Sequence, residues 1–117
     1  MLHLTVALVQ SQLHWADPAR NRSHFAGLLD EARGADLIVL PEMFTTGFTM
    51  NARELAEPMN SLTMAWLREQ AFRLQAVVAG SFIAEEGGRY YNRLVWMRPD
   101  GSRFAVPGIF NVVSINL

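Results

Sequence analysis

The clearest pattern along the chain is a set of short, nearly unbroken apolar runs, each followed by polar or turn-forming residues. These runs occupy residues 4–10, 36–40 and 76–83. Uninterrupted apolar runs of this length, rich in β-branched residues, are typical of strands that are buried on both faces. The pattern therefore predicts three buried strands, and it places the first in the interior of a sheet rather than at its edge.

The two segments between these strands have the periodicity of amphipathic helices. The first helix is predicted to begin with an N-cap, Asp17, and a proline at the first helical position, Pro18. Its apolar stripe has the spacing i, i+3, i+4, i+7 and consists of Phe25, Leu28, Leu29 and Ala32. The second helix is predicted to begin at Asn60 or Ser61 and to extend to about Leu74. A strand, a helix and a further strand in succession predict a βαβ unit with parallel strands.

The last third of the chain lacks a helical pattern. Turn residues at 85–88 and 98–101 delimit two further β-prone runs, 90–97 and 102–106, and the second turn predicts a hairpin between them. The segment 47–60 follows neither periodicity and is predicted to be a long loop beside the end of the second strand. The predicted order is β-α-β-α-β-β-β, an α/β fold in one small domain.

Composition and charge exclude several classes of protein. Half of the 117 residues are hydrophobic and 18% are charged, which excludes a disordered chain. The net charge is -1 and there is no basic block, so nucleic-acid binding is not expected. No apolar run approaches the roughly 18 residues needed to cross a bilayer. The N-terminus has no basic segment of the kind that begins a secretion signal, so a cytoplasmic protein is expected.

Two residue types are missing from the sequence, and both limit its chemistry. Cysteine is absent, which excludes disulfides, thiolate metal sites and a cysteine nucleophile within these residues. Lysine is absent too, because all ten basic residues are arginines. His3, His14 and His24 have no second ligand at metal-binding spacing, and Ser81 and Ser114 have no histidine at triad-like spacing. No metal and no cofactor are therefore expected.

The candidate functional residue is Glu42, which directly follows the second apolar run. Pro41 cannot donate to a β-ladder, so strand pairing is expected to stop there. In open α/β sheets ligands bind at the carboxyl ends of the strands, where this carboxylate lies. Its apolar neighbours Met43 and Phe44 would shield it from water, which suits a general acid or base. The alternative interpretation is a solvated glutamate at the start of a surface loop.

A longer pattern around Glu42 resembles a known family. Leu-Pro-Glu at the end of an apolar strand, followed by Met-Phe-Thr-Thr-Gly-Phe, resembles the first catalytic motif of the nitrilase superfamily, or carbon–nitrogen hydrolases, in its ω-amidase-like form. The resemblance covers about residues 4–106 and includes three further short motifs in the same order: Gly80-Ser81, Tyr91-Asn92 and Pro99-Asp100-Gly101. It implies the N-terminal part of a nitrilase-like αββα sandwich.

The resemblance also implies a catalytic triad of glutamate, lysine and cysteine, with Glu42 as the glutamate. The lysine would come just after the strand that ends near Val106, but residues 106–111 read Val-Pro-Gly-Ile-Phe-Asn, and the cysteine would come later still. We therefore expect residues 1–106 to be a partial carbon–nitrogen hydrolase domain and residues 107–117 a divergent, β-prone tail. A truncated chain of this kind is expected to be inactive alone.

Substrate and partners follow from the resemblance as expectations. Intact relatives hydrolyse small linear amides to acid and ammonia, and Phe44 and Phe48 are candidates to shape the substrate pocket, although a core role is as ordinary for each. The apolar sheet would leave surfaces uncovered, so a homo-oligomer or a complementing fragment is expected. An alternative is a non-catalytic binding or assembly module. A nucleotide-binding domain is disfavoured, because no glycine-rich phosphate loop follows any strand.

Overall fold

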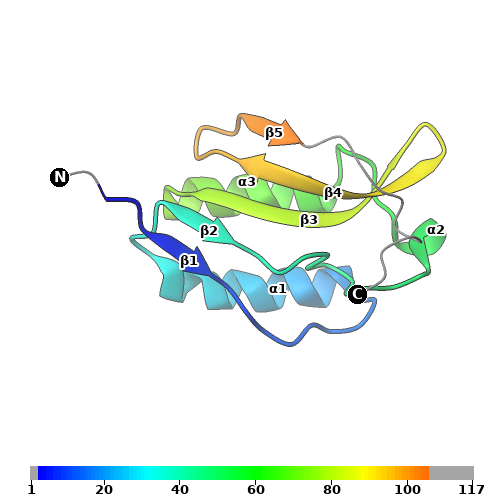
Figure 1. Ribbon diagram of the computed structural model, residues 1–117, viewed down its shortest axis with the longest axis horizontal. Helices are drawn as coiled ribbons and strands as arrows, with labels where there is room; N and C mark the ends of the chain where they lie inside the picture. Colours follow the sequence, from blue (N-terminus) through cyan, green and yellow to red (C-terminus); the bar gives the residue numbers. More distant parts are fainter. Residues whose placement is uncertain (1–2, 106–117) are drawn as a thin grey trace.

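The computed structural model describes residues 3–105, so the predicted tail at 107–117 lies outside the described residues. It confirms the predicted order of the main strands and helices (Figure 1). The elements are β1 (Val6–Leu8), α1 (Pro18–Leu28), the short 3₁₀ helix η1 (Leu29–Ala32), β2 (Leu37–Val39), α2 (Ala52–Leu55), α3 (Leu62–Leu74), β3 (Val77–Glu86), β4 (Arg89–Met97) and β5 (Arg103–Ala105).

Within the described residues the strands form one five-stranded sheet in the order β1-β2-β3-β4-β5. The first three strands are parallel to one another, and β3, β4 and β5 are successively antiparallel. The predicted βαβ unit and the predicted hairpin, which joins β4 and β5, are both confirmed. Gly87 and Gly88, with φ of 60° and 78°, form the tight turn between β3 and β4, because a two-residue hairpin of this type needs positive φ at both positions.

Local capping signals place both long helices as predicted. The Asp17 carboxylate accepts a hydrogen bond from the backbone N–H of Arg20 at 3.2 Å, and Pro18 occupies the first turn of α1. The hydroxyl of Ser61 accepts from the N–H of Met64 at 3.4 Å, which makes Ser61 the N-cap of α3. The end of β2 is also as predicted, since its last residue, Val39, lies two positions before Pro41.

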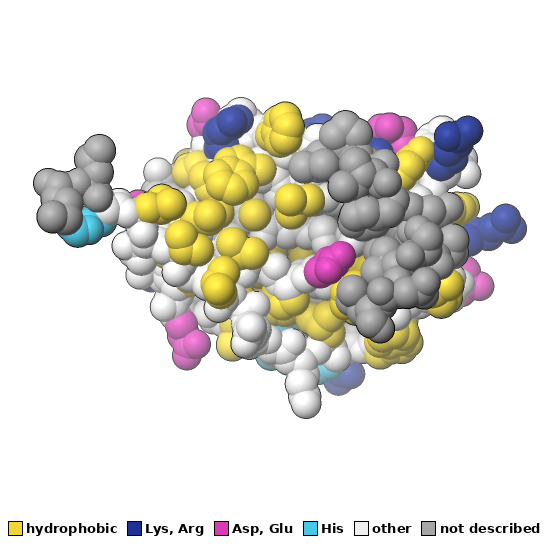
Figure 2. Space-filling model, in the orientation of Figure 1, with side chains coloured by type: hydrophobic (Ala, Val, Ile, Leu, Met, Phe, Trp, Pro, Cys, Tyr) yellow, Lys and Arg dark blue, Asp and Glu magenta, His cyan; other side chains and the backbone are white. Residues whose placement is uncertain are grey.

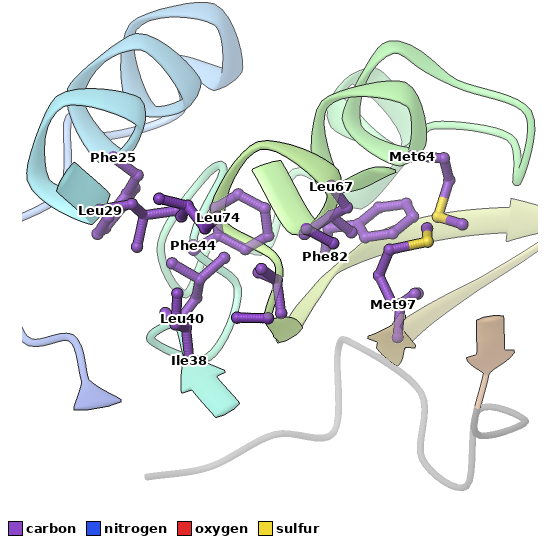
Figure 3. Packing of buried hydrophobic residues seen from close by; sticks show 14 of the residues in the cluster. Phe25, Leu29, Ile38, Leu40, Phe44, Met64, Leu67, Leu74, Phe82 and Met97 are labelled. Carbon is purple, nitrogen blue, oxygen red and sulfur yellow. The ribbon is translucent and has the colours of Figure 1, made fainter. Parts of the chain in front are cut away.

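Both helices lie behind the sheet in Figure 1, and the hydrophobic core fills the space between the two layers. Figure 3 shows this packing, with α1 and α3 on one side and the strands on the other. The labelled side chains of the core are Phe25, Leu29, Ile38, Leu40, Phe44, Met64, Leu67, Leu74, Phe82 and Met97. Burying large apolar side chains in this way is the main favourable contribution to folding.

The opposite face of the sheet is apolar as well, but no described element covers most of it. Figure 2 shows hydrophobic side chains gathered on this face, which we call the open face. Its exposed members are Val6, Leu8, Leu94, Trp96 and Phe104. For the described residues the prediction that β1 is an interior strand is wrong, because within 3–105 it forms one edge of the sheet and Leu8 is 71% exposed. The run at β1 is unbroken because both faces of this strand are apolar, and residues 3–105 cover only one of them.

The predicted loop at 47–60 contains the short helix α2 and a second, smaller core. Met43, Ala52 and Ile83 form this cluster, which packs against the strands beyond the end of β2. The backbone of Glu57 pairs with Ala84 of β3, which satisfies part of the strand edge that β2 leaves unpaired. None of the helices in the described part of the chain is long and apolar enough to span a bilayer.

Candidate active site

Glu42 lies just beyond the end of β2, on the side of the open face. The N–H of Leu40 still bonds to the carbonyl oxygen of Ala79 at 2.8 Å, and the chain then turns away at Pro41. The expectation that Glu42 is shielded from water is wrong for the described residues, in which its side chain is exposed. The physical reason is its position, because the helices cover the other face of the sheet.

Glu42 nevertheless lines a cavity rather than protruding freely. The cavity has a volume of about 250 Å³, and its lining consists of Leu40, Glu42, Ser81, Asn92 and Leu94. Side chains alternate across a strand, so Ser81 on β3 and Asn92 and Leu94 on β4 all point to the open face. The sheet thus brings together three short motifs that the sequence keeps apart: Leu-Pro-Glu, Gly-Ser and Tyr-Asn.

Hydrogen bonds tie Glu42 and its turn to the two neighbouring strands. The side-chain amide Nδ2 of Asn92 donates to Glu42 Oε1 at 2.7 Å. The backbone N–H of Met43 donates to the hydroxyl oxygen of Ser81 at 2.9 Å. Ser81 and Asn92 are each 6% exposed, and the Met43–Ser81 contact is buried, whereas the Asn92–Glu42 contact is partly buried because Glu42 itself is exposed.

The carboxylate of Glu42 has no basic partner in the part of the chain that the structure describes. The ion pairs found among residues 3–105 are Arg33–Asp30, Arg73–Asp30 and Arg93–Glu86. Arg93 follows Asn92 but points to the other side of β4, where its guanidinium lies over the Tyr91 ring at 4.9 Å. The described site therefore has an acceptor for a proton but no cation to stabilise an oxyanion.

A second cavity adjoins the first and shares Leu40 with it. It has a volume of about 360 Å³ and is lined by Leu8, Val9, Gln10, Ser11, Val39, Leu40 and Pro41. Most of these residues lie at the carboxyl ends of β1 and β2. Two cavities therefore lie side by side at the end of the sheet where ligands bind in open α/β folds.

The two phenylalanines proposed for substrate contact lie in different environments, and neither lines the cavity. Phe44 is fully buried between the sheet and the helices, with its ring 5.9 Å from that of Phe25 and 5.4 Å from that of Trp66. Phe48 is 42% exposed in the turn that follows. Contacts of either ring with a substrate stay a prediction.

Two of the histidines lie close together beside Ser11. His24 Nε2 and the Ser11 hydroxyl oxygen are 2.7 Å apart, and the His14 ring lies edge-on to that of His24. No carboxylate hydrogen-bonds either ring within residues 3–105, so the orienting group of a triad is not found there. The same part of the chain contains no cluster of three or more metal-ligating side chains.

Sequence reasoning singled out Glu42 as a candidate and used Asn92 and Ser81 only as members of short motifs. Their signal was the order of the short motifs, which indicated that Gly80-Ser81 ends one strand segment and Tyr91-Asn92 begins the next. It could not show that Asn92, 50 positions from Glu42, donates to its carboxylate. That contact depends on the register of three strands.

Comparison with families of known proteins gives a match over most of the chain. The model of the carbon–nitrogen hydrolase family matches residues 5–110. The omega-amidase YafV of Yersinia enterocolitica is 41% identical over 102 residues, which is 87% of this chain and 40% of that protein. The omega-amidase YafV of Escherichia coli K12 is 34% identical over 99 residues, with coverages of 85% and 38%. The chain thus spans about 40% of the length of these curated relatives.

Solved structures give the same result for the fold. A CN-hydrolase superfamily protein from Xanthomonas campestris, whose structure holds an arsenic adduct in its active site, is 42% identical and superimposes with a TM-score of 0.85. The match covers 90% of this chain and 40% of that one. A carbon–nitrogen hydrolase from Helicobacter pylori has a TM-score of 0.78 at 21% identity, which bears on the fold alone.

Proposed function

Because the chain belongs to the carbon–nitrogen hydrolase family, we propose that it forms the part of an omega-amidase-like active site that carries the general base, with Glu42 as that base. The observation that carries the proposal is the position of Glu42 in a cavity at the carboxyl end of β2, tethered by Asn92 at 2.7 Å. The substrate class would be small linear amides, since proteins similar to this chain are an omega-amidase and a 2-oxoglutaramate amidase.

The proposed reaction assigns Glu42 four successive proton transfers. As a carboxylate it accepts the proton of a nucleophilic thiol, and the thiolate attacks the amide carbonyl carbon. It then gives that proton to the leaving nitrogen, which departs as ammonia and leaves a thioester. It next accepts a proton from the water that attacks the thioester, and finally gives that proton to the departing sulfur, so that the acid is released and both the thiol and the Glu42 carboxylate are restored.

The thiol and the cation of this reaction cannot come from the 117 residues, which contain neither cysteine nor lysine. We therefore propose that the chain does not hydrolyse amides by itself and that a complementing polypeptide segment supplies both groups. Arg103 is not a replacement for the lysine, because a planar guanidinium differs in shape and hydration from a compact ammonium. The cytoplasmic location stays a prediction.

A chimera tests the role of Glu42 directly. Residues 1–105 of this chain would replace the matching part of the Yersinia omega-amidase, and ammonia release from a 2-oxo acid ω-amide would be measured. Release that Glu42→Gln lowers by at least about 100-fold supports the proposal. Glu69→Gln is the matched control, because Glu69 is exposed on the outer side of α3 and is expected to be neutral. A folded chimera without activity, or one in which Glu42→Gln changes nothing, contradicts the proposal.

A binding or assembly module is the alternative, and the open face favours it. Exposed apolar side chains such as Trp96 and Phe104 are typical of surfaces that contact another protein layer. In that case the same cavity would bind a ligand without chemistry, and the chimera would bind the amide without releasing ammonia. Either function is compatible with a second copy or a complementing segment covering the open face.

A further inference from the structure

The turn that carries Glu42 contains a strained backbone position. Met43 has φ of 51°, in the left-handed region that residues with side chains rarely occupy. Its side chain is fully buried, and its carbonyl oxygen accepts hydrogen bonds from the N–H groups of Thr46 at 3.2 Å and Gly47 at 2.8 Å. Strain of this kind persists only where the surrounding contacts hold it in place.

Ser81 of β3 supplies those contacts from the adjacent strand. Its hydroxyl oxygen accepts from the N–H of Met43 at 2.9 Å, and its carbonyl oxygen accepts from the N–H of Phe44 at 3.2 Å. One residue therefore binds both peptide N–H groups that directly follow Glu42. Without the hydroxyl, the N–H of Met43 would be left without this partner next to a buried side chain.

Asn92 of β4 holds the other end of the same glutamate. A carboxylate only accepts hydrogen bonds, so the amide must present its Nδ2 donor to Glu42 Oε1, and the orientation of the amide is fixed. Among residues 3–105, Glu42 Oε2 makes no hydrogen bond to the protein. This second oxygen is the one left to accept a proton.

A role in stability alone does not account for Asn92. Asparagine is unfavourable inside strands. In addition, its Oδ1 atom is buried without a hydrogen-bond partner in the described residues, which is a cost to the folded state. A β-branched residue at this position would avoid both penalties. The bond to Glu42 is the contact that such a residue would lose.

We propose that Ser81 and Asn92 are positioning residues that set the Glu42 carboxylate in one place and one orientation before any substrate arrives. This inference rests on the proposed role of Glu42 as general base. Ser81 fixes the peptide groups of the turn, Asn92 fixes Oε1, and Oε2 remains free for proton transfer. Holding a catalytic group ready in this way removes an entropic cost from the reaction.

The two residues lie on the most continuous part of the sheet. The β3–β4 ladder runs from the pair Val78–Met97 to the pair Glu86–Arg89, and the Ser81–Leu94 and Ile83–Asn92 pairs lie within it. Glu42, in contrast, lies in a turn outside any regular element. The positions of both hydrogen-bonding groups are therefore set by a regular ladder, and the loop adapts to them.

Side-chain NMR on the 117-residue chain tests the proposal without any amide hydrolysis. Three-bond couplings of Glu42 should report one rotamer in the unaltered protein and averaged rotamers in Asn92→Ala. In Ser81→Ala, the amide proton of Met43 should exchange with solvent roughly tenfold faster. Ser81→Thr, which keeps the hydroxyl, should restore the slow exchange. Tyr91→Phe is the matched control on β4, because its hydroxyl makes no hydrogen bond in the described residues.

A single Glu42 rotamer that survives Asn92→Ala in a folded chain overturns the proposal, even if the variant is less stable. In an active chimera, Asn92→Ala should lower kcat on the order of 100-fold with KM little changed. An inactive chimera would contradict the proposed function, and the rotamer measurement would still decide the roles of Ser81 and Asn92. The two failures are thus distinguishable.

Discussion

The two faces of the sheet are both apolar, but only one of them is closed by described residues. On the helix face, Ile38, Phe82 and Val95 are fully buried beneath α1 and α3. On the open face, Leu8 and Phe104 are 71% and 59% exposed. A single short strand can therefore contain both buried and exposed apolar side chains. The difference teaches that an apolar run shows how a strand can be covered, and only the tertiary structure shows which face is covered.

The candidate site belongs to the open face. Glu42, Ser81 and Asn92 meet there, and within residues 3–105 no basic side chain pairs with the carboxylate. In contrast, the helix face contributes packing and no candidate catalytic group. The helix face of the described residues therefore contributes packing, and the open face carries the candidate chemistry.

Truncating one large side chain on each face tests this comparison with the largest expected effect. Phe82 is fully buried on the helix face, so Phe82→Ala should lower the free energy of unfolding by about 3–5 kcal/mol or leave the chain unfolded. Phe104→Ala on the open face should cost less than about 1 kcal/mol, since that ring already contacts solvent. Urea unfolding of both variants measures this. Equal losses would contradict the distinction between the faces.

A pair of glycines tests how closely the helix face is packed. A Cβ atom on Gly80 would lie 3.0 Å from Leu40 Cδ1 and 3.0 Å from Phe44 Cε1, so Gly80→Ala should destabilise by about 1–3 kcal/mol. Gly27 in α1 has no atom within 4 Å of such a Cβ. Gly27→Ala should instead stabilise by up to about 1 kcal/mol through helix propensity. Thermal unfolding of the two variants gives the sign of each effect.

The open face is expected to drive association of the isolated chain. Trp96→Glu places a charge in the middle of this face and should weaken self-association at least about tenfold, which corresponds to about 1.4 kcal/mol. Leu62→Glu is the control, because Leu62 is 72% exposed at the start of α3, away from the open face. Sedimentation velocity over a range of protein concentrations measures the self-association of the unaltered chain and of both variants. A monomeric unaltered chain would contradict the prediction.

The elements were predictable because their signals are local. Asp17 and Ser61 mark helix starts through hydrogen bonds three residues away, and Gly87 marks a turn through its own backbone angle. The exposure of Glu42 and the edge position of β1 were not predictable, because they depend on which elements lie over the sheet. The contact between Glu42 and Asn92 joins residues 50 positions apart, so the local sequence around either residue does not predict it.

The smallest expected change in stability concerns an ion pair on the helix side, far from the open face. Arg73 of α3 hydrogen-bonds the Asp30 carboxylate of η1, and this contact, with the charges of Arg73 and Arg33, lowers the pKa of Asp30 below its ordinary value. A lowered pKa in the folded state means that the stabilisation is present above the unfolded pKa of about 3.9 and is lost as the pH falls through the folded value.

Asp30→Asn should therefore be slightly less stable than the unaltered chain at pH 7, and the difference should vanish in strong acid. Salt should shrink it, since the pair is exposed to solvent. Urea unfolding at the two pH values, each at low and high salt, measures it. A difference that persists in acid would assign the effect of Asp30 to packing rather than charge.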